Sequence, residues 1–499
     1  MTPSPPSEEP AAPPAPPAER GASAIDKWVV AVRRFGSPRR WRRTFAWLAA
    51  IVADVRRRRR EPRLTVGVDV NSLYEPLTGV GWYVHQLLLH LASAVDVRLR
   101  LYGQSLVEGD AGAPRPVVEM PAGAAIERVV YDAPDGLVVP PWRARQLLRK
   151  LAPLLVAADG NRVLFAPNFI APRTFRFAGG ARVATVHDLT LQRLPEAARP
   201  DTATALAQEL ERTLLTTASL VTPSAAVRDE LIARGVAPAR VRAIHHGPGQ
   251  LATLTAGELP PGTPPEYGLY VGTLEPRKNL PLLLAAWERL HRRSAKTPPL
   301  VLCGRWGWHA GDLTAAVNRG VAGGWLVHLG YVPPAGLAAL YRGATLLALP
   351  SLYEGFGLPV VEAFAAGTPV VASDLPVLRE VAGDAALFAP ASDVDAWTAA
   401  LLRVLGDATL RADLAARGRA RADRFDWRRA AAAHVEVWRS AAAREGRDAA
   451  DILPAVLPPE APAPSPIEAP SGPAPPAAAP ISGTSRSGTA EVAAPAATP

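Results

Sequence analysis

Residues 345–372 read TLLALPSLYEGFGLPVVEAFAAGTPVVA, a pattern that predicts a strand, a loop, a short helix and a second strand. The apolar runs at 345–349 and 370–372 are typical of buried parallel strands. Between them Pro359 suits the first turn of a helix and Gly367 suits its C-cap, so we expect a helix at about 359–366. The loop before it then lies at the carboxyl end of a strand, where open α/β sheets bind ligands.

Strand-like runs alternate with helical patterns on both sides of this stretch, which predicts an α/β protein. One series opens with Leu64 to Val70 and a second with Gly268 to Val271, so we expect two Rossmann-like domains facing each other across a cleft. The expected strands are 64–70, 162–166, 182–186 and 220–222 in the first series, and 268–271, 300–303, 326–329, 345–349 and 370–372 in the second. The expected organisation is a Pro-rich, basic N-terminal region at 1–40, a basic amphipathic segment at 41–62, a first domain at 63–250, a linker at 251–265, a second domain with terminal helices at 266–447, and a Pro/Ala-rich tail at 448–499.

Proline and charge are both unevenly distributed along the 499 residues. The chain has 53 prolines, and the Pro-rich tracts at both ends cannot bury enough apolar surface to fold, so we expect disordered tails. Residues 1–60 hold 13 Lys and Arg against 5 Asp and Glu, and therefore carry +8 of the net charge of +9. The remainder is nearly neutral, which argues against a nucleic-acid partner. The single cysteine, Cys303, excludes an internal disulfide and lies in an apolar run typical of a buried thiol.

Residues 41–60 read WRRTFAWLAAIVADVRRRRR, in which Trp41, Phe45, Leu48 and Val52 recur at helical spacing. Two interpretations stay open. The apolar residues and flanking arginines suit peripheral contact with an anionic membrane surface, or the helix packs on the protein's own body and the charge run is solvated. No apolar run reaches the length of a membrane-spanning helix and no signal peptide is apparent, so we expect a cytoplasmic protein.

Glu354 and Glu362 are the main candidates for chemistry, in the loop and in the first turn of the helix that follows it. A carboxylate can accept two hydrogen bonds at once, which suits the adjacent hydroxyls of a sugar. Gly355 and Gly357 allow backbone N–H groups to approach a ligand, and the helix N-terminus favours a diphosphate. An isolated pair of glutamates would more often be structural, but the glycines and the strand edge favour a binding site.

Two further loops follow strand-like runs and point to the same edge. Arg277 and Lys278 lie after the run 268–271, where cations can hold a diphosphate, and Asn279 is expected to cap the next helix. His187 and Asp188 follow the run 182–186 at the edge of the first sheet. A lone histidine at a strand end is more often structural, but its place opposite the Glu354 loop favours a functional role.

Other motifs give weaker or negative signals. Thr78-Gly79-Val80-Gly81 resembles the start of a dinucleotide fingerprint in a loop, but Val84 stands where the third glycine belongs, which disfavours an NAD site. Close backbone approach to a ligand at Gly79 and Gly81 is still expected. Asp393 and Asp395 have the spacing of a metal-binding motif but are expected to be helix-start residues. No histidine cluster suggests a metal, and none is expected.

Taken together, these residues resemble those of the retaining GT-B glycosyltransferases of family 4, in particular the bacterial mannosyltransferase-like branch that builds O-antigen and exopolysaccharide chains. The resemblance covers about residues 64–445, and its strongest motif is EX7E, met by Glu354 and Glu362. The supporting motifs are TGVGWYVHQLL at 78–88, TVHDLTLQRLPE at 185–196, YVGTLEPRKNL at 270–280, LGYVP at 329–333 and LPSLYEGFGLP at 349–359. One departure is Gly247-Pro248-Gly249, where members of the family commonly carry a glycine, an apolar residue and an aspartate. We expect Gly249 in place of the aspartate to affect local linker geometry and not catalysis.

The resemblance implies a nucleotide-sugar donor bound mainly by the second domain and an acceptor bound mainly by the first, without a metal or other cofactor. It implies that Arg277 and Lys278 hold the diphosphate, that Glu362 holds the ribose, and that Glu354 holds the transferred sugar. His187 would line the sugar pocket, and the backbone around Tyr331 and Val332 would hold the base. The expected catalytic residues are Glu354, His187, Arg277 and Lys278, and the expected substrate-binding residues are Gly79, Gly81, Asp188, Tyr331, Val332, Gly355, Phe356, Gly357, Leu358 and Glu362.

With this resemblance, we expect a retaining glycosyltransferase that transfers a hexose to a glycan or lipid-linked acceptor in cell-surface polysaccharide synthesis, with mannose from GDP-mannose as the favoured donor. Two alternatives stay open: a non-catalytic scaffold that binds nucleotide sugars, and a nucleotide-sugar isomerase. A scaffold would have no need of Glu354 and His187, and an isomerase would turn over the donor without an acceptor.

Overall fold

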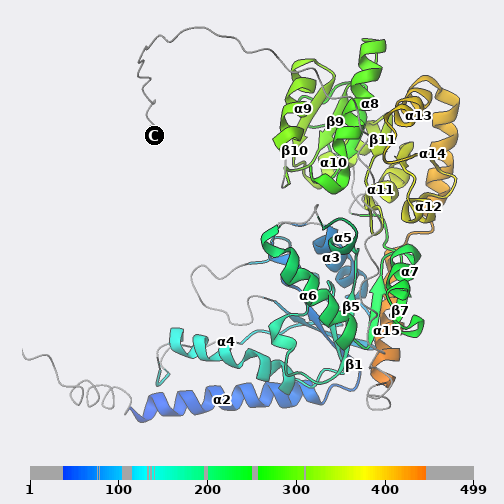
Figure 1. Ribbon diagram of the computed structural model, residues 1–499. Helices are drawn as coiled ribbons and strands as arrows, with labels where there is room; N and C mark the ends of the chain where they lie inside the picture. The colour runs from blue at the N-terminus through cyan, green and yellow to red at the C-terminus, as the bar shows by residue number, and fades with distance from the viewer. Residues whose placement is uncertain are drawn as a thin grey trace, which may run out of the picture. The chain divides into compact units, whose positions relative to one another are not determined.

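The computed structural model describes residues 37–444 except 76, 78, 104–114, 132–133, 135–136, 140, 196–199, 250–256 and 308–310. The Pro-rich regions predicted at both ends, apart from residues 37–40, lie outside the described residues, as do Thr78 and the first part of the linker. Two parallel sheets organise the described chain, as the alternating pattern predicts (Figure 1). None of the described helices is long and apolar enough to cross a membrane.

The first sheet has the strand order β3-β2-β1-β4-β5-β6-β7, and every strand pairs with its neighbours in parallel. Strand β1, in the interior of this sheet, is buried on both faces from Leu64 to Val68, as expected for a parallel strand covered by helices on both sides. The strands are β1 (Leu64–Asp69), β2 (Val97–Tyr102), β3 (Ile126–Arg128), β4 (Val163–Ala166), β5 (Ala181–Thr185), β6 (Ser219–Thr222) and β7 (Val241–Ala243).

The second sheet has the order β10-β9-β8-β11-β12-β13, and it is again parallel throughout. In both sheets the order runs outward from the first strand and then reverses on its other side, which is the arrangement of dinucleotide-binding folds. The strands are β8 (Gly268–Val271), β9 (Leu300–Cys303), β10 (Leu326–Gly330), β11 (Leu346–Leu349), β12 (Val370–Ser373) and β13 (Ala386–Ala389). Cys303 at the end of β9 is buried and free, as the sequence predicts.

Helices connect the strands of both sheets. In the first half these are α2 (Pro38–Arg59), α3 (Gly79–Leu91), α4 (Pro141–Ala158), α5 (Thr190–Arg193), α6 (Pro200–Thr216) and α7 (Ala225–Ala233). In the second half they are α8 (Leu280–Arg293), α9 (Gly311–Ala322), α10 (Pro334–Gly343), α11 (Leu358–Ala366), α12 (Pro376–Ala382), α13 (Val394–Gly406), α14 (Ala408–Ala422) and α15 (Trp427–Arg444). Ser224 caps α7, its hydroxyl oxygen accepting from the N–H of Val227 at 3.2 Å.

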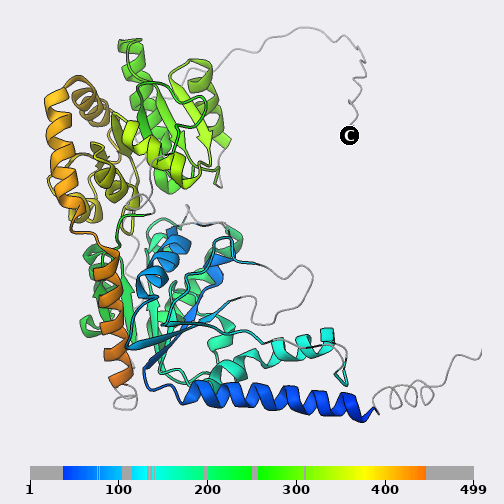
Figure 2. The same cartoon turned by 180° about the vertical axis from the view of Figure 1, so that it is seen from behind.

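The last helix, α15, packs against the first sheet and not the second (Figure 2). Trp438 is fully buried there, and the Tyr83 hydroxyl lies 2.7 Å from His434 Nε2. The sequence prediction grouped this helix with the second domain, and in that respect it was wrong. Helical periodicity identifies an apolar face but does not say which of two neighbouring cores the face will cover.

Two local predictions also need correction. Gly79 and Gly81 lie in the first turn of α3, so the helix begins before Trp82 and the two glycines are not in a loop. Asn279 occupies the position before α8 with a left-handed φ of 53°, but its side chain makes no cap. It donates instead to the carbonyl oxygens of Pro350 and Ala391, at 3.0 and 2.8 Å. Asn279 therefore fastens the loop after β8 to the loops after β11 and β13.

Candidate active site

The candidate site lies where the second sheet reverses its strand order, between β8 and β11. The two strands are hydrogen-bonded neighbours, so the loops that follow them emerge side by side at the carboxyl edge. A short 3-10 helix, Pro276–Lys278, carries Arg277 and Lys278 after β8, and residues 350–357 form the loop after β11. The N–H of Leu352 donates to the carbonyl oxygen of Arg277 at 2.9 Å and joins the two loops.

Glu354 is at the centre of this edge and is only 6% exposed. Its Oε1 accepts from Lys278 Nζ at 2.6 Å and from the Ser351 hydroxyl at 2.7 Å, and its Oε2 accepts from Arg277 at 3.2 Å. Burial acts to raise the pKa of Glu354, but the two cations and the hydroxyl outweigh it and lower the pKa to about 2. Glu354 is therefore a carboxylate at any physiological pH.

The two cations are held differently. Burial and the neighbouring charge of Arg277 lower the pKa of Lys278 against the opposing effect of Glu354. Arg277 also pairs with Glu275 at 2.8 Å and donates to the Tyr353 carbonyl oxygen at 3.1 Å. Although burial opposes it, the pKa of Arg277 is raised by Glu354, Asp188 and Glu275, so Asp188 of the first domain contributes to the potential at this site.

Formally the cluster contains two cations and two buried carboxylates and is neutral. Sequence reasoning treated Arg277 and Lys278 as cations available to a diphosphate, and missed Glu275 and Ser351. Glu275 lies two residues before Arg277, and neither spacing nor motif identifies it as a partner. The structure shows that the cations are already paired with carboxylates, so a bound diphosphate would have to share or replace those partners.

Glu362 lies in the second turn of α11, not the first as predicted, because the helix begins at Leu358. The Tyr341 hydroxyl of α10 donates to Glu362 Oε2 at 2.8 Å. Burial raises the pKa of Glu362 to about 7. Gly249 lies directly against the carboxylate, since a Cβ built on Gly249 would be 2.0 Å from Glu362 Oε1. The glycine that departs from the family pattern thus contacts a predicted site residue, and its effect extends beyond local linker geometry.

Each glycine in and around this loop is required for a different structural reason. Gly357 precedes α11 with φ of 92°, a conformation that favours glycine, and Gly367 ends the helix with φ of 77°. A Cβ on Gly355 would lie 1.9 Å from the carbonyl oxygen of His187. Gly355 therefore allows the loop after β11 to lie against the loop after β5.

Comparison with known proteins agrees with this geometry. The family model described as Glycosyltransferase Family 4 matches residues 77–247, and the model described as Glycosyl transferases group 1 matches residues 257–421. The O-antigen chain mannosyltransferase B of Escherichia coli is 32% identical over 375 residues, which cover 70% of this chain and 93% of that protein. The chain belongs to the family 4 glycosyltransferases.

A second relative is the phosphatidyl-myo-inositol mannosyltransferase of Mycolicibacterium smegmatis, 41% identical over 157 residues, or 31% of this chain and 39% of that protein. Solved structures show the same GT-B fold. Sucrose-phosphate synthase from Thermosynechococcus elongatus aligns with a TM-score of 0.57 at 22% identity, covering 76% of this chain and 99% of that one. WaaG, a glycosyltransferase involved in lipopolysaccharide biosynthesis, aligns with a TM-score of 0.53 at 16% identity, covering 74% and 99%.

His187 of this glycosyltransferase is half-buried and already hydrogen-bonded. Its Nε2 lies 2.8 Å from the carbonyl oxygen of Pro167, and because a carbonyl only accepts, Nε2 carries the hydrogen. Burial lowers the pKa of His187, so the ring is neutral and leaves Nδ1 as an acceptor. The ring stands edge-on to Tyr83 at 4.9 Å between centroids. The structure thus orients His187 for accepting a hydrogen bond.

The remaining predicted residues differ in what they offer a substrate. The Phe356 side chain is buried beside His246 and Phe425, and Val332 is buried in the core of the second domain, so only their backbones could contact a ligand. Tyr331 is 56% exposed, with the Arg305 guanidinium 4.6 Å from its ring centroid. Leu358 lies 3.9 Å from a Cβ built on Gly79, which brings the first turn of α3 close to that of α11.

The Asp393 and Asp395 pair has local structural roles. Asp393 caps α13, accepting from the N–H of Ala396 at 2.9 Å, and Asp395 pairs with Arg289. In the part of the glycosyltransferase that the structure describes, no group of three or more His, Cys, Asp or Glu side chains could hold a metal ion.

Proposed function

We propose that this glycosyltransferase is a retaining, metal-independent enzyme that transfers mannose from GDP-mannose to a glycan or lipid-linked acceptor in cell-surface polysaccharide synthesis. The observation that carries the proposal is the buried cluster of Glu354, Lys278 and Arg277 between β8 and β11. It combines a carboxylate suited to sugar hydroxyls with two cations suited to a diphosphate, at the edge where such sheets bind ligands.

In this proposal the diphosphate of the donor binds Arg277 and Lys278 in exchange for part of their contact with Glu354. The cations stabilise the negative charge that develops on the diphosphate as the sugar bond breaks. The acceptor hydroxyl attacks the sugar from the same face and gives its proton to the departing diphosphate oxygen. Glu354, released from one cation, accepts hydrogen bonds from the transferred sugar. Its pKa of about 2 keeps it ionised for this role. The neutral His187 would line the sugar pocket.

Glu362 is proposed to bind the ribose of the donor. Its carboxylate has Tyr341 as a hydrogen-bond donor on one oxygen, and the other oxygen faces Gly249, which has no side chain. Adjacent ribose hydroxyls can donate to a carboxylate in pairs. The backbone around Tyr331 and Val332 would take the base.

Two relatives that are named mannosyltransferases, O-antigen chain mannosyltransferase B and phosphatidyl-myo-inositol mannosyltransferase, support the choice of mannose. A donor screen tests it: the protein is incubated with GDP-mannose, UDP-glucose and other nucleotide sugars, with and without a lipid-linked glycan acceptor, and nucleotide release is measured. We expect acceptor-dependent release of GDP. Turnover of the sugar without acceptor would indicate an isomerase, and binding without turnover would indicate a scaffold.

The two glutamates can be separated by calorimetric titration with GDP. Glu354→Gln should abolish transfer and retain GDP binding, because the group of the donor that Glu354 is proposed to bind is the sugar. Glu362→Ala should weaken GDP binding itself. Unchanged GDP affinity in the Glu362 variant would remove the ribose assignment but leave the transferase assignment intact.

A further inference from the structure

Helix α2 lies outside the part of the chain that the family models match, and it carries an exposed apolar stripe. Trp41, Phe45, Leu48 and Val52 recur every three or four residues and therefore share one face of the helix. Their side chains are 44%, 62%, 45% and 47% exposed. The helix packs on the protein's own body, as one of the two interpretations of this segment predicts, but these four residues do not take part in that packing.

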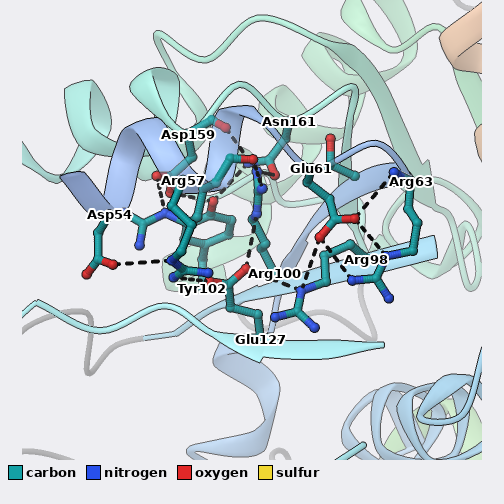
Figure 3. A network of polar contacts seen from close by, with 12 residues as sticks. Asp54, Arg57, Glu61, Arg63, Arg98, Arg100, Tyr102, Glu127, Asp159 and Asn161 are labelled. Carbon is teal, nitrogen blue, oxygen red and sulfur yellow. Dashed lines mark hydrogen bonds and ion pairs between the residues drawn. The ribbon is translucent and has the colours of Figure 1, made fainter. Parts of the chain in front are cut away.

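An adjacent face of α2 is fixed to the first domain (Figure 3). Trp47 and Ile51 pack against the core beneath α4. Arg58 is buried, and its guanidinium donates to Asp159 at 2.5 Å and to the Tyr131 hydroxyl at 2.9 Å. Because the buried Arg58 pair sets the rotation of the helix, α2 cannot turn its apolar stripe inward without breaking that pair.

The same contacts correct the reading of the arginine run at 56–60. Arg57 pairs with Asp54 and with Glu127, at 3.4 and 2.9 Å, and Arg59 donates to the Ala158 carbonyl oxygen. These arginines therefore hold the helix in place. Arg56 follows Val52 by four residues and continues the exposed stripe.

Helix α4 lies beside α2 and adds to the surface (Figures 1 and 2). Leu147, Leu151 and Leu154 form a second exposed stripe, 52%, 37% and 54% exposed. Arg143 and Lys150 lie next to this stripe on the helix. The two helices thus each combine exposed apolar residues with basic ones.

The charge of α2 and α4 indicates what kind of partner their exposed surface would bind. The sequences of α2 and α4 contain twelve Lys and Arg and a single acidic residue, Asp54. Arg57, Arg58 and Arg59 bind partners within the protein, and the other nine Lys and Arg still far outnumber the one acidic residue. A second copy of the same surface would bring like charges together and be repelled. We propose that α2 and α4 form a docking surface for an anionic lipid bilayer, with α2 parallel to the membrane and its apolar stripe in the headgroup region. The proposal rests on these two helices and not on the proposed transfer reaction.

Flotation of the full chain with vesicles tests the proposal. We expect binding to vesicles containing about one third phosphatidylglycerol and little binding to phosphatidylcholine alone. The double variant Phe45→Glu and Leu48→Glu should reduce the vesicle partition coefficient at least about tenfold, because charges replace inserted apolar groups. A second variant, Trp41→Ser with Val52→Ser, should also weaken binding without adding charge.

The matched control is Val95→Glu with Leu402→Glu, since both residues are exposed apolar side chains elsewhere on the protein. It should bind vesicles like the unaltered chain. Salt at about 1 M should also weaken binding, because the screening length falls to roughly 3 Å. Point variants are preferable to deletion of α2, which would leave Asp159 buried without Arg58.

Three outcomes would overturn the proposal. In the first, the unaltered chain does not float with anionic vesicles. In the second, both stripe variants float as well as it does while retaining its melting temperature. In the third, the stripe variants change the oligomeric state in size-exclusion chromatography and not the lipid binding, in which case the stripe is an interface between copies. None of these results depends on whether the donor has been identified.

Discussion

Two buried ionic clusters in this protein contain the same types of residue but have different roles. In the first domain Asp159 is bound by Arg58, and Arg100 donates to the Asp159 backbone carbonyl. In the second domain Glu354 is bound by Lys278 and Arg277. Asp159 and Arg58 precede strands β4 and β1, whereas the second cluster follows β8 and β11. Position at the amino or carboxyl edge of a sheet, and not composition, separates a structural cluster from a candidate binding site.

The two clusters also differ in where their hydrogen-bond partners lie. Asp159 accepts from Tyr102 at 2.7 Å, and Arg100 donates to the side-chain oxygen of Asn161 (Figure 3). Arg100 also donates to the backbone carbonyl oxygen of Arg58. Tyr102 lies in β2 and Arg58 in α2, and both elements are packed in place. The partners of Glu354 come from two loops, which a ligand can approach. Substitutions in the first cluster should therefore lower the free energy of unfolding. Substitutions in the second should lower ligand affinity and the rate of the reaction.

The largest effect should follow from removing a cation of the second cluster. Arg277→Ala and Lys278→Ala should each reduce kcat/KM by about 10²- to 10³-fold, since a preorganised donor to a developing charge contributes about 3 to 4 kcal/mol. Steady-state kinetics with the identified donor would measure this. The control is Arg289→Ala, which removes an exposed pair with Asp395 in the same domain and should leave the rate unchanged. Near-normal kcat/KM in both site variants would show that neither cation stabilises the departing diphosphate.

The next largest effect is on stability, in the first cluster. Asp159→Ala leaves Arg58 buried without its carboxylate and should lower the free energy of unfolding by about 3 to 5 kcal/mol. The folded variant should keep its kcat/KM. Denaturant titration measures the loss, and Asp54→Ala, which breaks an exposed pair with Arg57, should cost no more than about 0.5 kcal/mol. Equal losses in the two variants would mean that burial does not distinguish the Asp159 pair.

The contrast also shows what the sequence could predict. The second site was predictable because its residues are close in sequence to strand ends: Glu354 follows one apolar run and Lys278 another, and parallel strands bring their carboxyl ends to one edge. The pairing of Arg58 with Asp159 spans 101 residues and follows no periodicity. Five consecutive arginines look alike in sequence, and only the packing of α2 against α4 determines which of them is buried.

The side-chain partners within the candidate active site were also not predictable from the sequence. Glu275 and Ser351 complete the charge cluster, but nothing in their spacing distinguishes them from solvated loop residues. The strands β2, β3, β7 and β13 were also not predicted, since their short or charge-interrupted runs, such as VRLRLY in β2, lack a clear strand pattern. Arg100 lies within β2 and is fully buried because the cluster satisfies its charge. Tertiary contacts override the sequence signal at such positions.

A smaller effect concerns the pH dependence of stability. Burial raises the pKa of Glu362 to about 7 from its usual value of 4.5, so the folded protein keeps this proton when the unfolded chain has lost it. The contribution of this proton to the free energy of unfolding is fully present below about pH 4.5 and is lost as the pH rises through about 7. Relative to Glu362→Gln, the unaltered protein should lose up to about 3 kcal/mol of stability between these values.

Glu354→Gln is the matched control, because the pKa of Glu354 is lowered to about 2 and its contribution has the opposite sign. The contribution of ionised Glu354 to the free energy of unfolding is present above about pH 4.5 and is lost only as the pH falls through about 2. Urea titrations at several pH values between about 5 and 8 should therefore show a sloping difference for the Glu362 variant and a level one for the Glu354 variant. Level differences for both would mean that Glu362 is ionised in the folded protein.

The smallest effect should come from adding one methyl group at Gly249. A Cβ there would meet Glu362 Oε1, the end of a flexible side chain, so the fold can adjust by moving the carboxylate. Gly249→Ala should therefore change the free energy of unfolding little but weaken GDP binding about tenfold, or about 1.4 kcal/mol. Gly179→Ala is the control, since a Cβ at Gly179 meets no atom within 4 Å. In a Glu362→Ala background the Gly249 change should have no further effect on affinity, because the displaced group is gone. An equal loss of affinity in both backgrounds would mean that Gly249 acts through the backbone and not through the proposed ribose carboxylate.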